Sequence, residues 1–186
     1  MVAAVPPASF PGWRIAWALA VTTTVGYGVL TYGFGVFTLP METELGWSRA
    51  QTSGAFSLAL LVSGLAAYQV GRWVDARGAR GLMTAGSLLA AAVVLLWSFV
   101  NSLPMLYLVQ AGVGLAMSLV LYDVAFTVIA TWFRRDRIKA LLLVTMVAGL
   151  ASTIFIPLAT ALVEGLGWRA ALRVLALILA VVTVPL

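Results

Sequence analysis

Residues 81–122 read GLMTAGSLLAAAVVLLWSFVNSLPMLYLVQAGVGLAMSLVLY, and no charged side chain occurs among these 42 residues. A helix of about 20 apolar residues crosses a hydrocarbon core about 30 Å thick, so this stretch is long enough for two crossings. Asn101, Ser102 and Pro104 lie near its middle and favour a turn. We therefore expect two membrane-spanning helices joined at this turn.

The sequence on either side of this stretch repeats the pattern. Three further uncharged stretches, 15–41, 50–71 and 140–163, are each long enough to span. Residues 168–186 are apolar except for Arg169 and Arg173, whose long side chains can reach the interface. We predict an all-α integral membrane protein with a cytoplasmic tail at residues 1–12 and a six-helix bundle at 13–186. The helices are expected at about 13–40, 50–71, 79–100, 103–132, 138–164 and 169–186.

Composition excludes several classes of protein. The chain is 63% hydrophobic and 9% charged, whereas soluble domains carry about 25% charged residues. The absence of cysteine and histidine excludes disulfides, thiol chemistry and the commonest metal ligands, and no paired acidic site suggests an enzyme. We expect no catalytic residue, no metal and no cofactor. The net charge of +5 lies in short loops between spans, which points to the lipid bilayer rather than to nucleic acid.

The distribution of basic residues predicts the orientation. With the amino terminus in the cytoplasm, eight Lys and Arg residues lie on that side and three on the other. Basic residues accumulate in cytoplasmic loops, so both termini of this multi-pass cell-membrane protein are expected to be cytoplasmic.

An internal repeat is suggested by two loops that are 89 residues apart. Val74–Arg80 and Val163–Arg169 both fit Val-acid-x-x-Gly-x-Arg, which pairs Asp75, Gly78 and Arg80 with Glu164, Gly167 and Arg169. Because the repeated unit holds three helices, its second copy enters the membrane from the opposite side. This predicts an inverted 3+3 repeat, although four loosely defined positions can also recur by chance.

The loop Gly71-Arg72-Trp73-Val74-Asp75-Ala76-Arg77-Gly78-Ala79-Arg80 resembles the signature loop of the major facilitator superfamily. Gly71, Asp75, Gly78 and Arg80 match that pattern, whereas Trp73, Ala76 and Ala79 depart from it. The resemblance implies a twelve-helix transporter fold, of which this chain is similar to the amino-terminal half. It also implies that Gly71, Asp75, Arg77, Gly78 and Arg80 form a latch between two halves. A simpler interpretation makes Asp75 a helix cap and the arginines topology signals.

Further motifs are similar to those of monocarboxylate-porter-like members of the superfamily. They are Gly12-Trp13-Arg14, Tyr32-Gly33-Phe34-Gly35-Val36-Phe37 and Gly46-Trp47-Ser48-Arg49. This resemblance implies that the substrate is a small organic anion such as a monocarboxylate. Tyr32 stands where some animal members carry a helix-1 lysine, and Leu108 stands where many proton-coupled members carry a helix-4 arginine.

Asp123 is the ionisable residue deepest within a predicted span, about 16 Å along the helix from Arg134. A carboxylate there is costly to ionise, so it faces a cavity, takes up a proton or pairs with a partner. We expect Asp123, Tyr122, Tyr32, Thr31 and Gln110 to bind substrate or couple ions. The alternatives are a protonated Asp123 bonded to a neighbouring helix, and hydroxyl and amide groups that only join helices.

These observations predict a secondary active transporter that works by alternating access and is driven by a proton or another ion. Such a site lies between two six-helix bundles, so a second bundle is required. The chain stops at Leu186 without a basic linker, and we expect it to pair with a missing carboxyl-terminal half or with a second copy. The alternatives are a stand-alone structural or accessory membrane protein and an inactive truncated transporter fragment.

Overall fold

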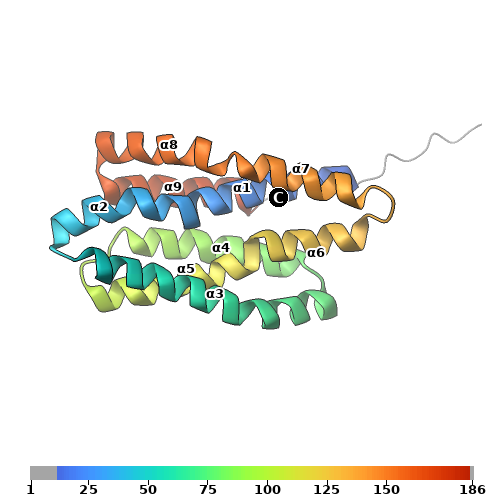
Figure 1. Ribbon diagram of the computed structural model, residues 1–186, viewed down its shortest axis with the longest axis horizontal. Coiled ribbons are helices and arrows are strands. Elements are labelled where there is room, and N and C mark those ends of the chain that lie inside the picture. The colour runs from blue at the N-terminus through green and yellow to red at the C-terminus, as the bar shows by residue number, and fades with distance from the viewer. Residues whose placement is uncertain (1–11, 185–186) are drawn as a thin grey trace, which may run out of the picture.

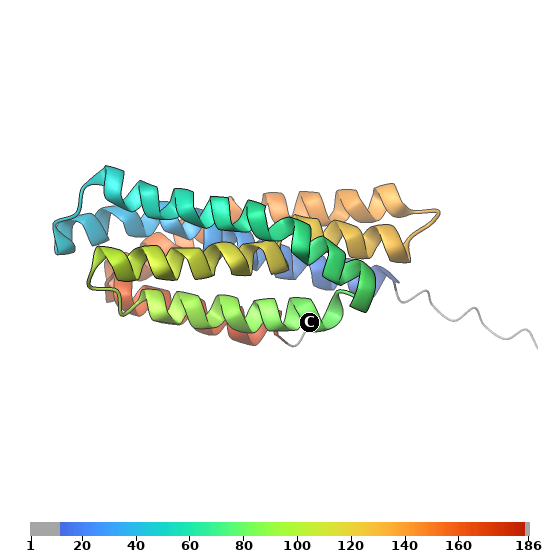
Figure 2. The same cartoon turned by 90° about the horizontal axis from the view of Figure 1, so that it is seen from below.

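The computed structural model describes residues 12–184, and every element in that range is a helix. Short turns join the helices into an elongated bundle whose helices run along its long axis (Figures 1 and 2). The all-α prediction is therefore confirmed for the described residues, while the predicted tail lies outside them except for Gly12, which begins the first helix. In chain order the elements are α1 (Gly12–Gly26), η1 (Tyr27–Tyr32), α2 (Gly33–Leu45), α3 (Arg49–Arg77), α4 (Arg80–Trp97), α5 (Leu103–Val120), α6 (Tyr122–Trp132), α7 (Arg137–Gly149), α8 (Ala151–Leu166) and α9 (Trp168–Thr183).

Five helical runs within the described residues are long and apolar enough to cross a membrane. They are Gly12–Leu45, Arg49–Arg77, Arg80–Trp97, Leu103–Trp132 and Arg137–Leu166. The predicted sixth span corresponds to α9, which has 16 described residues, fewer than the roughly 20 of a complete crossing. The structure thus has five long runs and a shorter sixth helix, as expected from the brevity of the last apolar segment.

The runs differ from the predicted helices at their ends and in their interiors. The first run continues past residue 40 to Leu45, because Pro40 is accommodated inside α2. The second continues past residue 71 to Arg77, since charged side chains on the last turns remain exposed. The fourth and fifth runs, expected as single helices, are interrupted at Leu121 and Leu150.

The turn between α2 and α3 shows why Gly46-Trp47-Ser48-Arg49 ends one helix and begins another. Gly46 has φ 68°, which a residue with a side chain rarely adopts, and its N–H donates to the Glu42 carbonyl at 3.0 Å. The Ser48 N–H donates to Gln51 Oε1 at 2.9 Å, and the Gln51 N–H donates to Ser48 Oγ at 3.3 Å. This capping box satisfies N–H groups that a helix start leaves unpaired.

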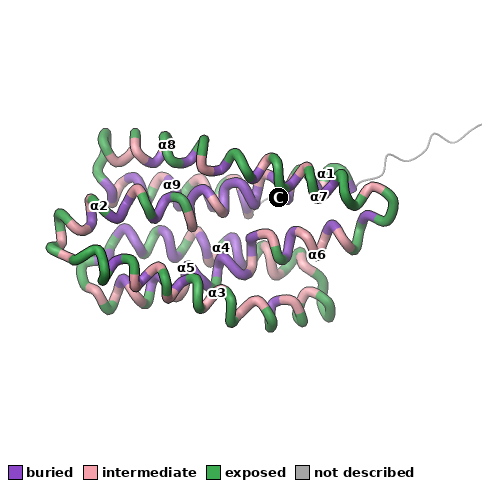
Figure 3. Tube along the Cα trace, in the orientation of Figure 1, coloured by how far each residue is buried: buried purple, intermediate pink, exposed green. Residues whose placement is uncertain are grey.

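The first and fourth runs form the middle of the bundle, and the second and fifth lie at its edges (Figure 3). Trp97 is fully buried in the core, where it packs on Phe34 and Phe37 and donates its indole N–H to Met41 Sδ at 3.2 Å. Large apolar side chains cover much of the outside. They include Leu65, Leu108 and Met146, which are 71%, 75% and 73% exposed. Such a surface suits lipid rather than water.

One cluster fastens three helices at the end of the bundle that holds the α2–α3 turn. Arg169, near the start of α9, donates to Glu44 at the end of α2 at 3.0 and 3.2 Å, and the Trp168 indole donates to the same carboxylate. Arg169 also donates to the carbonyls of Ser98 and Val100, after α4, and to Asn101 Oδ1. We call Glu44, Trp168, Arg169 and the groups that Arg169 bonds the Arg169 cluster.

Candidate functional site

The two central runs are both irregular in their interiors. Between α1 and α2 the chain forms the π-helical turn η1, in which the Gly33 N–H donates to the Gly28 carbonyl five residues earlier. Between α5 and α6, Leu121 has φ −88° and ψ −163°, an extended conformation that breaks the helix. Helix interruptions of this kind are typical of functional sites inside membrane proteins.

These two irregularities lie against each other. Gly26, which precedes η1, approaches α5 so closely that an added Cβ would lie 3.1 Å from Leu121 and 3.6 Å from Val120. On the other side of η1, an added methyl group at Gly28 would overlap the ring of Phe155 in α8. Glycine therefore permits three runs to meet at the interruptions.

Aromatic and acidic side chains gather where the interruptions meet. The rings of Tyr27 and Tyr122 lie 4.7 Å apart between centroids, and Tyr122 stacks on Phe126 at 4.9 Å. Tyr32 and Asp123 lie within electrostatic range of Tyr27. We call Tyr27, Tyr32, Tyr122 and Asp123 the tyrosine–aspartate cluster.

The tyrosine–aspartate cluster is exposed at the surface of this bundle through Tyr32 and Asp123. Tyr32 is 39% exposed and Asp123, in the first turn of α6, is also exposed. The Asp123 carboxylate has no ion pair or side-chain hydrogen bond with any residue from 12 to 184. The cluster thus presents a free carboxylate and phenol groups that can donate hydrogen bonds.

Tyr27 was not among the predicted site residues. It lies five positions before Tyr32, a spacing that separates two side chains on an α-helix. The wider π turn, which bonds residues five apart, brings them toward the same face. No residue pattern that we used signals a π turn, so the sequence analysis missed it.

Thr31 and Gln110 do not join the exposed cluster. Gln110 is fully buried in α5, about 20 Å along the chain from Asp123, and neither of its amide atoms has a hydrogen-bond partner among the described residues. Thr31 Oγ1 is likewise buried without such a partner. The structure therefore brings together Tyr32, Tyr122 and Asp123, and leaves these two predicted residues inside the bundle.

Basic residues within the described range are confined to the ends of the runs. The end that holds the α3–α4 and α6–α7 turns carries Arg14, Arg72, Arg77, Arg80, Arg134, Arg135, Arg137 and Lys139, and the opposite end carries Arg49, Arg169 and Arg173. Residues 12–184 contain no group of His, Cys, Asp or Glu side chains placed to hold a metal ion. The exposed cluster in the middle of the bundle offers tyrosine hydroxyls and the Asp123 carboxylate.

The loop expected to form a latch joins α3 to α4 and lies at the surface. Gly78 has φ 81°, and its N–H caps α3 by donating to the Val74 carbonyl at 2.9 Å. Arg77 lies over the Trp73 ring at 5.0 Å. Asp75 is exposed and forms no ion pair with a described residue, while Gly71 lies inside α3 and Arg80 begins α4. The Asp75 carboxylate is therefore not used to hold this bundle together.

The second copy of the motif adopts nearly the same backbone conformation. Gly167 has φ 81° and ψ 158°, close to the φ 81° and ψ 164° of Gly78, and its N–H donates to the Val163 carbonyl at 2.9 Å. Glu164, like Asp75, is exposed. The two arginines differ, because Arg169 forms the Arg169 cluster whereas Arg80 makes no side-chain bond to a described residue.

Long apolar helices with interrupted central runs and basic ends are typical of membrane transport proteins. The sequence matches the family model described as Major Facilitator Superfamily over residues 16–186. The chain belongs to this superfamily, whose members here are transporters and not enzymes.

Three relatives show the extent of the similarity. Human monocarboxylate transporter 6 is 30% identical over 161 residues, which cover 83% of this chain and 31% of the relative. Mouse monocarboxylate transporter 11 is 30% identical over 174 residues, covering 91% of this chain and 38% of the relative. The uncharacterized MFS-type transporter YcxA of Bacillus subtilis (strain 168) is 24% identical over 179 residues, covering 93% and 43%. The chain thus spans less than half the length of each of these relatives.

Proposed function

We propose that this chain forms one six-helix half of a secondary active transporter for a small organic anion of the monocarboxylate type, with Asp123 as its proton-binding group. The observation that carries the proposal is the tyrosine–aspartate cluster, a free carboxylate and three phenols at the meeting point of two interrupted helices. The names of the human and mouse relatives support the carboxylate substrate.

Charge explains how such a cluster would couple a proton to an anion. Two negative charges 5 Å apart repel by about 3 kcal/mol at an effective dielectric constant of about 20. The described residues place no arginine or lysine in the middle of the runs to offset this repulsion. A proton on Asp123 removes it, so protonation and anion binding favour each other. The Tyr27, Tyr32 and Tyr122 hydroxyls would then donate to the bound carboxylate.

Alternating access needs a second bundle, supplied by a carboxyl-terminal half or by a second copy of this chain. Support comes from the exposed position of the cluster and from relatives more than twice as long as this chain. In this proposal Gly71, Asp75, Arg77, Gly78 and Arg80 latch the two bundles, since the Asp75 carboxylate is unpaired among the described residues.

We also propose that the bundle is an inverted 3+3 repeat. The offset of 89 residues relates Gly78 to Gly167, which share their backbone conformation, and relates Tyr32, the last residue of η1, to Leu121 at the other interruption. The eight-to-three distribution of basic residues supports cytoplasmic termini in this arrangement.

The decisive experiment measures uptake of labelled lactate, pyruvate and dicarboxylates into proteoliposomes that contain the full transporter, including its second bundle. The Asp123→Asn variant keeps the shape of the side chain but cannot carry the proton. We expect it to lose uptake driven by a proton gradient and to retain counterflow exchange. The matched control is Glu164→Gln, which neutralises an exposed acid outside the cluster.

Unchanged gradient-driven uptake by the Asp123→Asn variant would eliminate Asp123 as the coupling residue. Loss of counterflow as well, in a protein that remains folded, would move Asp123 from coupling to substrate binding. If no carboxylate is transported by the unaltered protein, the substrate class itself is wrong.

A further inference from the structure

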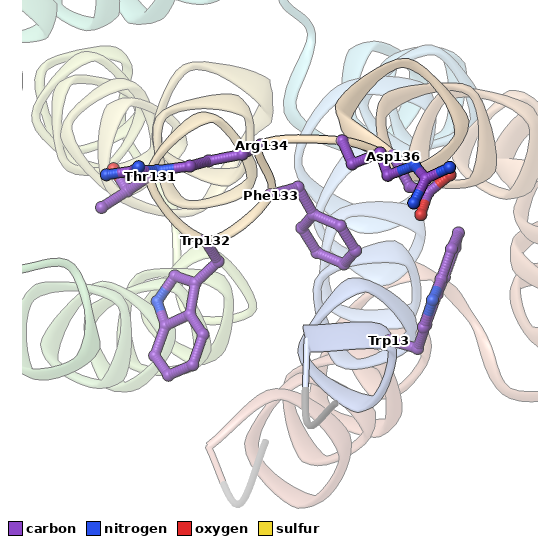
Figure 4. Close-up of a pocket in the computed structure, with 7 residues that line it drawn as sticks. Trp13, Thr131, Trp132, Phe133, Arg134 and Asp136 are labelled. Carbon is purple, nitrogen blue, oxygen red and sulfur yellow. The ribbon is translucent and has the colours of Figure 1, made fainter. Parts of the chain in front are cut away.

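A hollow of about 470 Å³ lies at one end of the bundle, away from the tyrosine–aspartate cluster. It is formed where α1 begins and where α6 turns into α7, and Trp13, Trp132, Phe133, Arg134 and Arg135 line it together with Thr131 and Asp136. Figure 4 shows Phe133 between Trp132 and Trp13. The Trp13 and Phe133 rings meet edge to face at 5.3 Å, which joins the start of α1 to the α6–α7 turn. Its volume falls within the range of ligand sites.

The two arginines of the hollow are not neutralised within the described chain. Asp136 is the one acid in the lining, and it pairs with Lys139 at 2.9 Å. Arg134 and Arg135 are exposed and form no ion pair with residues 12–184. The hollow therefore carries a positive charge that only a ligand or solvent ions can balance.

The helix ends at the hollow add to this charge. The free carbonyls at the end of α6 carry partial negative charge toward the hollow. Arg137 offsets this charge, because it donates to the carbonyls of Ala130 at 2.8 Å and Phe133 at 3.2 Å. The start of α7 has no side-chain cap, because Asp136 is at the capping position and does not bond the backbone N–H groups. These N–H groups point toward the α6–α7 turn and favour an anion there.

The aromatic lining is of the kind found at membrane surfaces. Trp132 ends the run Leu103–Trp132, and Trp13 is the second residue of the run Gly12–Leu45. Both indoles are partly exposed, at 49% and 37%, and tryptophan is enriched where headgroups meet acyl chains. Ile138, the second residue of α7, is 74% exposed and can enter the same layer.

We propose that this hollow binds the phosphate of an anionic phospholipid headgroup, such as that of phosphatidylglycerol. Arg134 and Arg135 supply the positive charge that attracts the phosphate, the uncapped N–H groups of α7 supply donors, and Trp13 and Trp132 lie against the glycerol and upper acyl chains. The aromatic lining favours a lipid over a soluble phosphate ester, because it also offers apolar contact. This site does not depend on the role of Asp123.

The proposal is tested by native mass spectrometry of the full protein, delipidated in detergent and titrated with dioleoyl-phosphatidylglycerol or dioleoyl-phosphatidylcholine. Arg134→Gln/Arg135→Gln removes the charge of the hollow. Arg14→Gln/Arg72→Gln is the matched control, since it removes two charges from the same end but outside the lining. At roughly fivefold for each arginine, we expect the first pair to weaken phosphatidylglycerol binding about 25-fold. The control pair should weaken it less than about threefold, and thermal unfolding without lipid should stay unchanged in both.

Equal losses in the two pairs would overturn the proposal in favour of a diffuse surface charge, as would equal binding of the two lipids. A third titration uses glycerol phosphate and inorganic phosphate. If either phosphate raises the Tm of the unaltered protein as much as phosphatidylglycerol does, and if Arg134→Gln/Arg135→Gln abolishes that rise, the ligand is a soluble phosphate. The lipid assignment would then be wrong. Salt should weaken the specific binding, because the charges are exposed.

Discussion

Replacement of Arg169 by methionine is expected to destabilise the bundle more than loss of any other arginine near a helix end. Arg169 donates to four groups, Glu44, Asn101 and the carbonyls of Ser98 and Val100, over distances of 2.8 to 3.2 Å. Hydrogen bonds to charged groups are worth about 1.5–3 kcal/mol each. The Arg169 side chain is 27% exposed and the Glu44 side chain is 48% exposed, so hydrogen bonds to water replace part of this stabilisation in the variant. We expect a loss of about 3 kcal/mol.

The assay is thermal unfolding of the purified protein in one detergent at fixed lipid content. For a chain of this size about 3 kcal/mol corresponds to a fall of roughly 6–12 °C in Tm. Arg169→Lys should recover about half of it, because an ammonium can hold Glu44 but cannot reach the other acceptors at once. Arg49→Gln is the control. The Arg49 side chain is 64% exposed, so its ion pair with Glu42 should contribute less than about 1 kcal/mol to stability.

The reasoning would be refuted if Arg169→Met and Arg49→Gln lowered Tm equally. It would also fail if Arg169→Lys were as unstable as Arg169→Met and Glu44→Gln cost nothing, because Glu44 would then not be a partner. A double-mutant cycle between positions 44 and 169 should give a coupling of about 1–2 kcal/mol.

Three further predictions concern packing, capping and the latch. Gly28→Ala should lower the free energy of unfolding by about 1–3 kcal/mol, because its methyl group would overlap the Phe155 ring. Gly35→Ala is the control and should be neutral or slightly stabilising, because nothing lies within 4 Å of an added Cβ there. Equal Tm values for the two variants would contradict the close contact at Gly28. Ser48→Ala removes the capping box and should cost about 1 kcal/mol, measured by the same assay, with Ser48→Thr as the control that retains the cap. Asp75→Asn should change which face of the full transporter is open to cysteine labelling, and an unaltered labelling pattern would count against the latch.

The helical membrane fold could be predicted because lipid leaves the chain few choices. Uncharged stretches of more than 20 residues become helices, since each backbone N–H and C=O must be bonded within its own segment. The ends of α2 and α3 also follow from local chemistry, through Gly46 and Ser48. For this reason the positions of the runs could be predicted more closely than their interiors.

The interruptions could not be predicted, because glycines such as Gly28 and Gly33 at η1 also occur inside regular helices, as Gly35 does in α2. The helix breaks at Leu121 without a neighbouring proline or glycine, and Leu121 packs so closely on α1 that an added Cβ at Gly26 would lie 3.1 Å from its side chain. Tyr27 joins the site only through the π turn. In the same way, the sequence marks Arg169 as part of a repeated motif but does not show that it reaches Glu44, 125 residues away.

The amino-acid sequence by itself determined that this protein crosses a membrane as a helical bundle with basic ends, and which acid lies within a span. These properties depend on transfer between water and lipid, which acts on each segment separately. Only the tertiary structure decided that two interrupted helices meet, that Tyr27 and Tyr122 pack together within electrostatic range of Asp123, and that Arg134 and Arg135 line an aromatic hollow. Such arrangements depend on close packing between segments distant in the chain, and a single sequence does not specify which residues will touch.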